Sequence, residues 1–267
     1  MILATLAAAL ALLAPKPATL IAAGDVASCR SSGDEATAAL VAKIPGTVAV
    51  LGDIVYERGT AAELARCYSP SWGRFRKRTR PALGNHDYGS GSAAPAIAYF
   101  GLPKQGYYSY QLGAWHVVAL NSNCWAVGGC GPDSPQERWL RADLAAHPAR
   151  CTLAYWHHPR FSSGLHGGTT AVTGLWDALA DTGADLVLAG HDHHYERFAP
   201  VNGIRSFVVG TGGRSRYPVL RRTAASQVVD ARTNGVLKLT LRASGYSWRF
   251  LPVAGGTFTD AGSGRCR

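Results

Sequence analysis

The chain has 267 residues, of which 47% are hydrophobic and 16% charged, with a formal net charge of +10. This length suits one large α/β domain and is short for two, and the composition excludes an intrinsically disordered protein. Arginine supplies most of the charge, and its densest run lies at 74–80. Such a run can bind nucleic acid, but this one leads directly into an apolar segment, which favours a solvated surface. A positive surface would also attract anionic substrates.

The first 14 residues are almost wholly apolar, and Pro15 and Pro17 follow them. A short apolar run rich in Ala and Leu is typical of a secretory signal peptide, although no Lys or Arg precedes it here. The run is short for a membrane span. We therefore expect residues 1–17 to be a signal peptide or its remnant. Residues 18–267 would then form a single domain of a protein that is secreted, or retained at the cell surface.

Six cysteines lie at positions 29, 67, 124, 130, 151 and 266. An even number behind an export-like N-terminus predicts three disulfides, and no Cys-x-x-Cys pattern indicates a zinc knuckle. The residues at 124 and 130 bracket a Gly-rich loop and are expected to pair with each other. Cys29–Cys67 and Cys151–Cys266 are then the simplest remaining pairs.

The predicted elements alternate between strands and helices early in the chain, and strands dominate late. Ser/Thr-x-x-Glu patterns at Ser32, Thr60 and Ser134 predict capping boxes, with helices running to about Lys43, toward Cys67 and to about Ala146. Further helices are expected over 93–100 and 175–181. Strands are expected over 19–23, 47–51, 80–83, 107–111, 115–121, 152–156, 186–189, 204–209, 236–241 and 246–252. A single α/β domain with two packed sheets and helices outside fits this order.

The most informative stretch is the end of the apolar run 186–189, where Gly190 is followed by His191 and His193. In an extended strand, histidines one residue apart would face opposite sides. A Gly-led turn beyond the strand can instead direct both imidazoles to one point. A lone histidine would be an ordinary surface group, but this pair at a strand end favours metal binding.

Four other apolar runs also end in potential ligands. Asp25 follows the first run, and Asp53 follows the second with Tyr56 three residues later. Asn85 and His157 follow two more. Because ligands in α/β sheets bind beyond the carboxyl ends of strands, these five ends together describe a metal centre.

These motifs resemble the calcineurin-like metallophosphoesterases and, within them, the purple acid phosphatases. One departure from the family pattern is Ala27. The family commonly has Gly at this position, and many relatives outside the purple group have a metal-binding His. Because Ala cannot bind a metal, Tyr56 is the natural replacement for that His. The resemblance implies a four-layer α/β/β/α sandwich with two mixed sheets. The matching motifs are Gly24-Asp25, Gly52-Asp53-x-x-Tyr56, Gly84-Asn85-His86-Asp87, His157 with Pro159, and Gly190-His191-x-His193.

The resemblance implies two metal ions that share Asp53. The first would be held by Asp25, Tyr56 and His193, and the second by Asn85, His157 and His191. Carboxylate and phenolate are hard donors that suit Fe(III), whereas an amide oxygen and two imidazoles suit a divalent ion such as Zn, Fe or Mn.

The implied reaction is hydrolysis of a phosphate monoester by attack of a metal-bound hydroxide, as in acid phosphatases. His86 is expected to protonate the leaving group or stabilise its charge, with Asp87 orienting it. His166 would contact the substrate or lie on a flexible loop. A phosphodiesterase or nucleotide hydrolase on the same centre is an alternative, as is a polyanion-binding protein with an idle metal site. The expected partner is a small phosphorylated substrate, without specific nucleic-acid binding or stable membrane insertion; the oligomeric state stays open.

Overall fold

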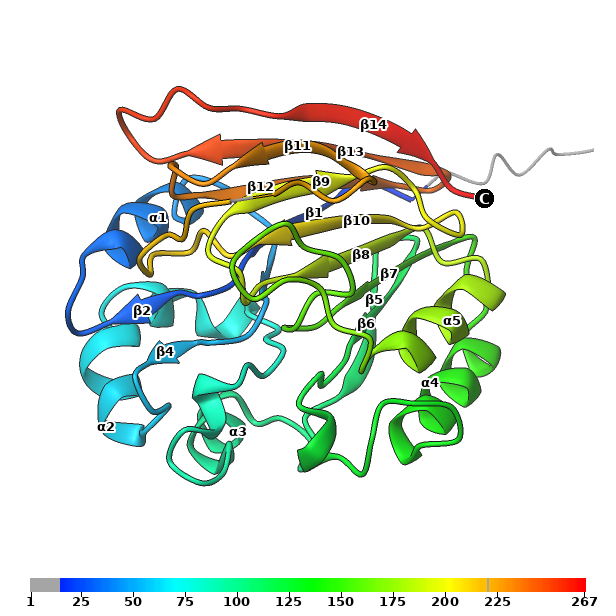
Figure 1. The fold of residues 1–267 in the computed structure, drawn as a ribbon, viewed down its shortest axis with the longest axis horizontal. Helices are drawn as coiled ribbons and strands as arrows, with labels where there is room; N and C mark the ends of the chain where they lie inside the picture. The colour runs from blue at the N-terminus through cyan, green and yellow to red at the C-terminus, as the bar shows by residue number, and fades with distance from the viewer. Residues whose placement is uncertain (1–14, 220) are drawn as a thin grey trace, which may run out of the picture.

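Two β-sheets packed face to face form the centre of the molecule (Figure 1). The computed structural model describes residues 15–219 and 221–267, so the expected signal segment 1–14 lies outside the described residues. Helix α1 packs beside the five-stranded sheet, and α4 and α5 cover the far face of the seven-stranded sheet. The predicted α/β/β/α arrangement with two mixed sheets is therefore confirmed.

The five-stranded sheet has the strand order β14-β13-β12-β1-β3. Strand β1 pairs in parallel with β3 and antiparallel with β12, so the sheet is mixed. Its bounds are β1 Ala18–Ala23, β3 Thr47–Val50, β12 Gly235–Arg242, β13 Gly245–Pro252 and β14 Ala261–Arg265, with α1 at Gly33–Val41 beside it.

The seven-stranded sheet has the order β11-β9-β10-β8-β7-β6-β5. Strands β6, β7, β8 and β10 run parallel to one another, and the strands at either side pair antiparallel. Parallel strands covered on both faces need continuous apolar runs, which is what the sequence supplies at these strands. The bounds are β5 Tyr108–Leu112, β6 Trp115–Ala119, β7 Cys151–Tyr155, β8 Leu186–Ala189, β9 Tyr195–Phe198, β10 Arg205–Val209 and β11 Ser226–Asp230, with α4 at Pro135–Ala146 and α5 at Thr173–Asp181.

Alternate residues of the central strands enter two different cores. Leu153 and Leu188 point between the sheets, whereas Ala154 and Val187 belong to the core beneath α4 and α5. This alternation follows from the two-residue period of a strand. Both faces of the central strands are buried in hydrophobic cores. Polar side chains that contact a substrate from solvent are therefore expected at the strand ends.

The predicted helix starts have different outcomes. Thr60 makes a complete capping box with Glu63. Ser134 caps α4 by accepting from the Glu137 N–H, but the Glu137 carboxylate accepts from the Asp133 N–H instead of from Ser134. Ser32 makes no side-chain cap at all, so that prediction was wrong even though α1 follows it.

The short elements lie between β1 and β5 and carry several site residues. Their bounds are β2 Ala27–Ser28, β4 Val55–Tyr56, α2 Ala61–Glu63, a π-helical turn Leu64–Tyr68, 3₁₀ turns Trp72–Arg78 and His86–Tyr88, and α3 Ala94–Phe100; a further 3₁₀ turn, Cys124–Ala126, follows β6. The strand expected over 80–83 is not formed, because Ala82 makes only an isolated bridge to Leu51. Strands β9, β11 and β14 were missed.

All three expected disulfides are present, joining Cys29 to Cys67, Cys124 to Cys130, and Cys151 to Cys266. The third ties β7 to the residues after β14 and so links the two sheets covalently. Within 15–219 and 221–267, none of the helices has the length and apolar character needed to span a membrane.

Candidate metal centre

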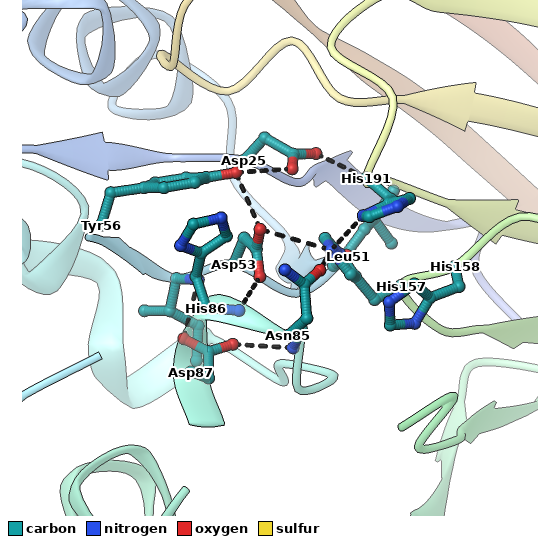
Figure 2. A network of polar contacts seen from close by, with 12 residues as sticks. Asp25, Leu51, Asp53, Tyr56, Asn85, His86, Asp87, His157, His158 and His191 are labelled. Carbon is teal, nitrogen blue, oxygen red and sulfur yellow. Dashed lines mark hydrogen bonds and ion pairs between the residues drawn. The ribbon is translucent and has the colours of Figure 1, made fainter. Parts of the chain in front are cut away.

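The polar residues at four strand ends meet where the two sheets come together (Figure 2). Asp25 and Asp53 follow β1 and β3 of one sheet, and His157 and His191 follow β7 and β8 of the other. Asp25, Asp53 and His191 all have positive φ, at 61°, 48° and 72°. The left-handed backbone turns each of these side chains out of its strand direction and toward the shared point.

Glycines beside the ligands allow the loops to approach one another. A Cβ on Gly84 would lie 2.1 Å from Asp53 Oδ1, and a Cβ on Gly52 would lie 2.6 Å from His157 Nδ1. No side chain fits at such separations, so the Gly-led motifs are required by the packing of one ligand loop on the next.

A first group of donor atoms consists of two carboxylates, a phenol and an imidazole. The Tyr56 hydroxyl lies 2.9 Å from Asp25 Oδ1, 2.8 Å from Asp53 Oδ2 and 3.1 Å from His193 Nε2. His193 Nε2 is also 3.3 Å from Asp25 Oδ1. Two ligands of one ion at metal–ligand distances of about 2.1 Å are separated by about 3.0–3.4 Å, so this group has the spacing of a coordination shell.

A second group shares one atom with the first. Asp53 Oδ2 lies 3.4 Å from His157 Nε2, which is 3.0 Å from Asn85 Oδ1 and 3.2 Å from His191 Nδ1. Two imidazole nitrogens at this distance either share one hydrogen or both direct lone pairs at an ion. A cation between them, with Asp53 Oδ2 belonging to both groups, satisfies all of these donors.

Backbone carbonyls fix which ring nitrogen each histidine presents. His157 Nδ1 lies 2.8 Å from the Leu51 carbonyl, and His193 Nδ1 contacts the Ser215 carbonyl. A carbonyl only accepts, so each Nδ1 carries a hydrogen and each Nε2 is the nitrogen that faces the centre. Both rings are thus oriented as ligands before any ion arrives.

The negative charges buried in the pocket also favour the binding of cations. Asp25, Asp53 and Tyr56 are almost fully buried. Burial raises the pKa of the Tyr56 phenol well above its usual range, and the Asp25 and Asp53 carboxylates raise it further. Two buried carboxylates beside a phenol are costly unless positive charge compensates them. The residues present therefore fit a pair of metal ions.

The pKa values of His191 and His157 are shifted in opposite directions. Burial lowers the pKa of His191 to about 2, assisted by the neighbouring His157 and His158. Burial acts in the same direction on His157, but the Asp53 carboxylate outweighs it and raises that pKa to about 9. A cation would thus displace a proton from His157, whereas His191 is already in the form that ligates.

His86 lies beside Tyr56, with 4.3 Å between ring centroids, and its backbone N–H donates to Asp53 Oδ1 at 2.9 Å. Its imidazole Nδ1 is 2.7 Å from the Glu57 carbonyl. The expectation that Asp87 orients His86 was wrong. Among the described residues, the buried Asp87 carboxylate accepts from the N–H groups of Ile54 and Gly84, so it joins the two ligand loops and Glu57 holds the His86 ring.

His166 lies at the rim, 4.6 Å from the His191 ring and 5.4 Å from the Tyr217 ring. Its backbone N–H donates to the buried Asp192 carboxylate at 2.9 Å, and Ser162 donates to the same carboxylate. Its loop is therefore attached to the His191–His193 turn, and the exposed imidazole stands over the centre.

Several residues around the centre were missed by sequence reasoning. Tyr217 stacks on His193 with 4.2 Å between centroids, and Arg214 lies 4.9 Å above the Tyr56 ring while pairing with Glu57 at 3.0 Å. Asp192 was passed over between two conspicuous histidines, although a carboxylate in such a motif was a usable signal. No spacing in the sequence pointed to Arg214 or Tyr217.

The Gly210–Gly213 segment bends, and its N–H groups bond to other loops of the protein. The Gly210 N–H donates to the His194 carbonyl at 3.1 Å and the Gly212 N–H to the Gly24 carbonyl at 2.9 Å. Both groups are therefore used within the protein and are not available to a phosphate.

Solved structures with the same fold include a purple acid phosphatase from yellow lupin (Lupinus luteus) seeds. It has a TM-score of 0.74 at 18% identity, and the match covers 93% of this chain and 53% of that one. The Plasmodium protein GAP50, described as the anchor in the inner membrane complex, also has a TM-score of 0.74, at 15% identity over 92% of this chain and 88% of that one. At these identities the likeness shows the fold alone.

Relatives by sequence lead to a family. An uncharacterized Mycobacterium tuberculosis protein is 29% identical over 232 residues, covering 73% of this chain and 41% of its own. Purple acid phosphatase 15 of Arabidopsis thaliana is 26% identical over 200 residues, covering 59% of this chain and 37% of its own. The chain thus spans less than half the length of these relatives. The family model for calcineurin-like phosphoesterases matches residues 3–195, and the chain belongs to that family.

Proposed function

We propose that the protein hydrolyses phosphate monoesters at a two-metal centre, in the manner of acid phosphatases. The observation that carries this proposal is the position of Asp53 Oδ2, which lies 2.8 Å from the Tyr56 hydroxyl and 3.4 Å from His157 Nε2. One carboxylate oxygen thus belongs to both donor groups, as a bridging ligand requires.

In this proposal Asp25, Tyr56 and His193 hold the first ion, and Asn85, His157 and His191 hold the second, with Asp53 shared. The phenol and carboxylates suit Fe(III), and the amide and imidazoles suit Zn, Fe or Mn in the divalent state. When bound, the ions would supply an activated water and charge stabilisation for the phosphoryl oxygens.

Residues of the chain supply the rest of the chemistry. His86 would give the leaving oxygen its proton from the nitrogen that does not face Glu57, and the Glu57 carbonyl keeps the ring in that orientation. Asp87 acts as a positioning residue, because it accepts from the backbone N–H groups of Ile54, next to Asp53, and of Gly84, next to Asn85. His166 would contact the substrate at the rim. We also propose that residues 18–267 act as one catalytic domain and that the protein is secreted, which the disulfides support.

A nucleotide hydrolase or phosphodiesterase on the same centre is the second candidate. A cavity of about 530 Å³ adjoins the centre through Tyr217, and Arg216 and Arg232 line it. Two guanidinium groups suit a substrate with a further anionic group. The ratio of rates on a nucleoside diphosphate and on a simple alkyl phosphate would separate the candidates. An Arg216→Ala and Arg232→Ala double variant should lower only the former rate.

A polyanion-binding protein with an idle centre is a weaker candidate. Part of the basic run serves the fold, because Arg78 donates to the carbonyls of Val41, Ile44 and Gly46, and Arg76 stacks over Tyr99 at 4.7 Å. These side chains are already engaged, which leaves a smaller free basic surface than the sequence suggests.

The first experiment combines metal analysis with a visible absorption spectrum of purified protein. Iron and a second metal at about one each per chain, with a purple band, are expected, because a phenolate bound to Fe(III) absorbs visible light. Tyr56→Phe should remove the band, whereas Tyr110→Phe, which changes a phenol paired with Tyr155 away from the centre, should keep it.

The same samples test catalysis. His191→Ala should abolish turnover of an alkyl phosphate and lower the metal content. A colourless protein that stays colourless after oxidation and contains two divalent ions would contradict the iron assignment, and full activity of His191→Ala would contradict the centre itself.

A further inference from the structure

A second cluster of metal-ligating side chains lies at the other end of the seven-stranded sheet. His116 on β6 is opposite Asp143 and His147, which are one turn apart at the C-terminal end of α4. His116 pairs in register with Thr152 near the start of β7, whereas His157 of the metal centre follows the end of that strand. The cluster is therefore separated from the centre by the length of a strand.

The donor atoms of the cluster converge. His116 Nε2 lies 3.0 Å from Asp143 Oδ2, and His147 Nδ1 lies 3.1 Å from Asp143 Oδ1. One donor atom from each of the three side chains falls within 4.8 Å of the others. Ligands of a single ion occupy this range of separations.

The contact between His116 and Asp143 is not a hydrogen bond. Both ring nitrogens of His116 and Asp143 Oδ2 are buried without a hydrogen-bond partner among the described residues, although Nε2 and Oδ2 are only 3.0 Å apart. The nitrogen and the oxygen thus point past each other. Two ligands that are both directed at a third point have this geometry, and buried polar atoms without partners are otherwise unfavourable.

The surroundings hold the ligands in place and favour a cation. Ser109 donates to Asp143 Oδ1 at 2.8 Å, which orients the carboxylate so that Oδ2 turns toward His116. The cluster lies at the negative end of the dipole of α4.

One side of the cluster is open to solvent. His116 is 2% exposed and the Asp143 side chain is 8% exposed, but the His147 side chain is 57% exposed. An ion can therefore enter from the α4 side, with water completing its shell. The His147 Nδ1 lies 2.9 Å from the Asp143 carbonyl, which only accepts, so an ion that binds here has to replace that contact as the exposed ring turns.

We propose that His116, Asp143 and His147 bind one divalent cation of the zinc type, separate from the two-metal centre. Two imidazoles and one carboxylate suit Zn²⁺, with water as the fourth ligand. Its effect is structural: the ion joins the end of α4 to β6 and fixes the turn that leads into β7. It plays no part in the reaction.

The test measures zinc per chain in protein made without a histidine tag and dialysed against a zinc buffer. The wild type should hold one more zinc than His147→Ala and than Asp143→Asn, and zinc should raise the Tm of the wild type more than that of either variant. Arg150→Ala, a change on the neighbouring exposed loop, is the control and should match the wild type. Activity on phosphate esters should be the same in His147→Ala and the wild type.

Failure of this proposal is distinguishable from failure of the metal centre. In His191→Ala the zinc that depends on His147 should remain, while the metal of the centre is lost. Equal zinc content in the wild type, His147→Ala and Asp143→Asn, with equal Tm responses, would overturn the proposal. The three residues would then be a proton-sharing network. An affinity for zinc that falls at least roughly tenfold in His147→Ala would support it, as expected for loss of a ligand.

Discussion

At the scale of single residues, a substitution of His86 best distinguishes a role in catalysis from a role in metal binding. Its ring contacts Tyr56 and the Glu57 carbonyl, and only its backbone N–H contacts the Asp53 carboxylate. His86→Ala should lower kcat on an alkyl phosphate by about 10²–10³-fold, because the leaving alkoxide then lacks its proton donor. Metal content should be unchanged.

The leaving group provides the control for this prediction. A nitrophenolate is stable without protonation, so the loss of rate in His86→Ala should be much smaller on a nitrophenyl phosphate than on an alkyl phosphate. Equal losses on both substrates would show that His86 acts by binding and not by proton transfer.

Asp34 gives a prediction about pH. It is buried in the first turn of α1, with Oδ2 accepting from Ser71 and Oδ1 without a partner among the described residues, and burial raises its pKa to about 7. The folded protein therefore binds this proton more tightly than the unfolded chain, whose pKa is about 3.9. The contribution of Asp34 to the free energy of unfolding should fall as pH rises from about 4 to about 7.

Asp34→Asn removes this dependence. At about 1.4 kcal/mol per pKa unit, the difference in unfolding free energy between the variant and the wild type should grow in favour of the variant by up to about 4 kcal/mol between pH 4 and pH 8. Denaturant unfolding at several pH values measures it. A constant difference across this range would mean that Asp34 is ionised in the folded protein with an ordinary pKa.

Residues at strand ends could be predicted from sequence, and residues on loops could not. Asp25, Asp53, His157 and His191 each follow an apolar run, and the geometry of a sheet brings such ends together. Tyr217 and Arg214 reach the centre from a loop whose course depends on long-range packing. For the same reason the role of Asp87 was mistaken: its neighbour in sequence is His86, but its hydrogen bonds go to the backbone of Ile54 and Gly84.

At the scale of elements, the short helix α2 stabilises the loop that carries Tyr56. The Glu63 carboxylate accepts from the Thr60 N–H at 2.9 Å and from the Glu57 N–H at 2.7 Å. Glu63→Ala should lower the free energy of unfolding by about 1–3 kcal/mol. It should also lower kcat, because the Glu57 carbonyl that orients His86 would no longer be fixed.

Thr60→Ala is the matched change for this prediction. It removes the Thr60 side chain from the cap, at about 1 kcal/mol, but leaves the bond between Glu63 and the Glu57 N–H. Activity should then be close to that of the wild type. An equal loss of kcat in both variants would show that the helix acts as a whole and not through Glu57.

Elements that pair through the backbone were harder to predict than elements with an apolar face. The parallel strands β6, β7 and β8 are mostly apolar, because both of their faces are covered; His116 and Thr152 are the polar exceptions. Strand β14 has the sequence Ala-Gly-Ser-Gly-Arg and is held by its pairing with β13. Because Gly262 and Gly264 have no side chains, the rings of Trp248 and Tyr246 on β13 can pack directly against them. Its own residues carry no signal for a strand.

At the scale of the whole molecule, the three disulfides contribute unequally. The Cys151–Cys266 bond closes a loop with a sequence separation of 115, whereas Cys124–Cys130 closes one of 6. Loop-closure entropy predicts that removing the first costs about 2–3 kcal/mol more than removing the second. Chemical denaturation of the two double Cys→Ser variants measures this difference. Equal losses would mean that the unfolded chain keeps the two sheets close together without the bond.

The architecture itself was largely predictable. The order of strands and helices indicates two packed sheets, and the motifs at the strand ends indicate that those ends meet at one side of the sheets. The order of strands within each sheet was not, because β9, β11 and β14 carry weak strand patterns and β11 pairs with β9 instead of with a neighbour in sequence. Even so, the proposed site could be located without them, since none of these strands ends in a proposed ligand.

The left-handed backbone at Asp25, Asp53 and His191 limits which amino acids evolution can try at the centre. Among side chains that bind metals, Asp, Asn and His tolerate positive φ several times more often than others, whereas Glu, Tyr and Cys rarely adopt it. In the proposed centre, each of these positions must satisfy both the requirements of metal coordination and those of a left-handed backbone. A change of Asp25 to Glu keeps the carboxylate but violates the backbone requirement. The set of amino acids that fit these three positions is therefore much smaller than the set of possible metal ligands. Substitutions that change the preferred metal are expected mainly at the other proposed ligands, Tyr56, Asn85, His157 and His193.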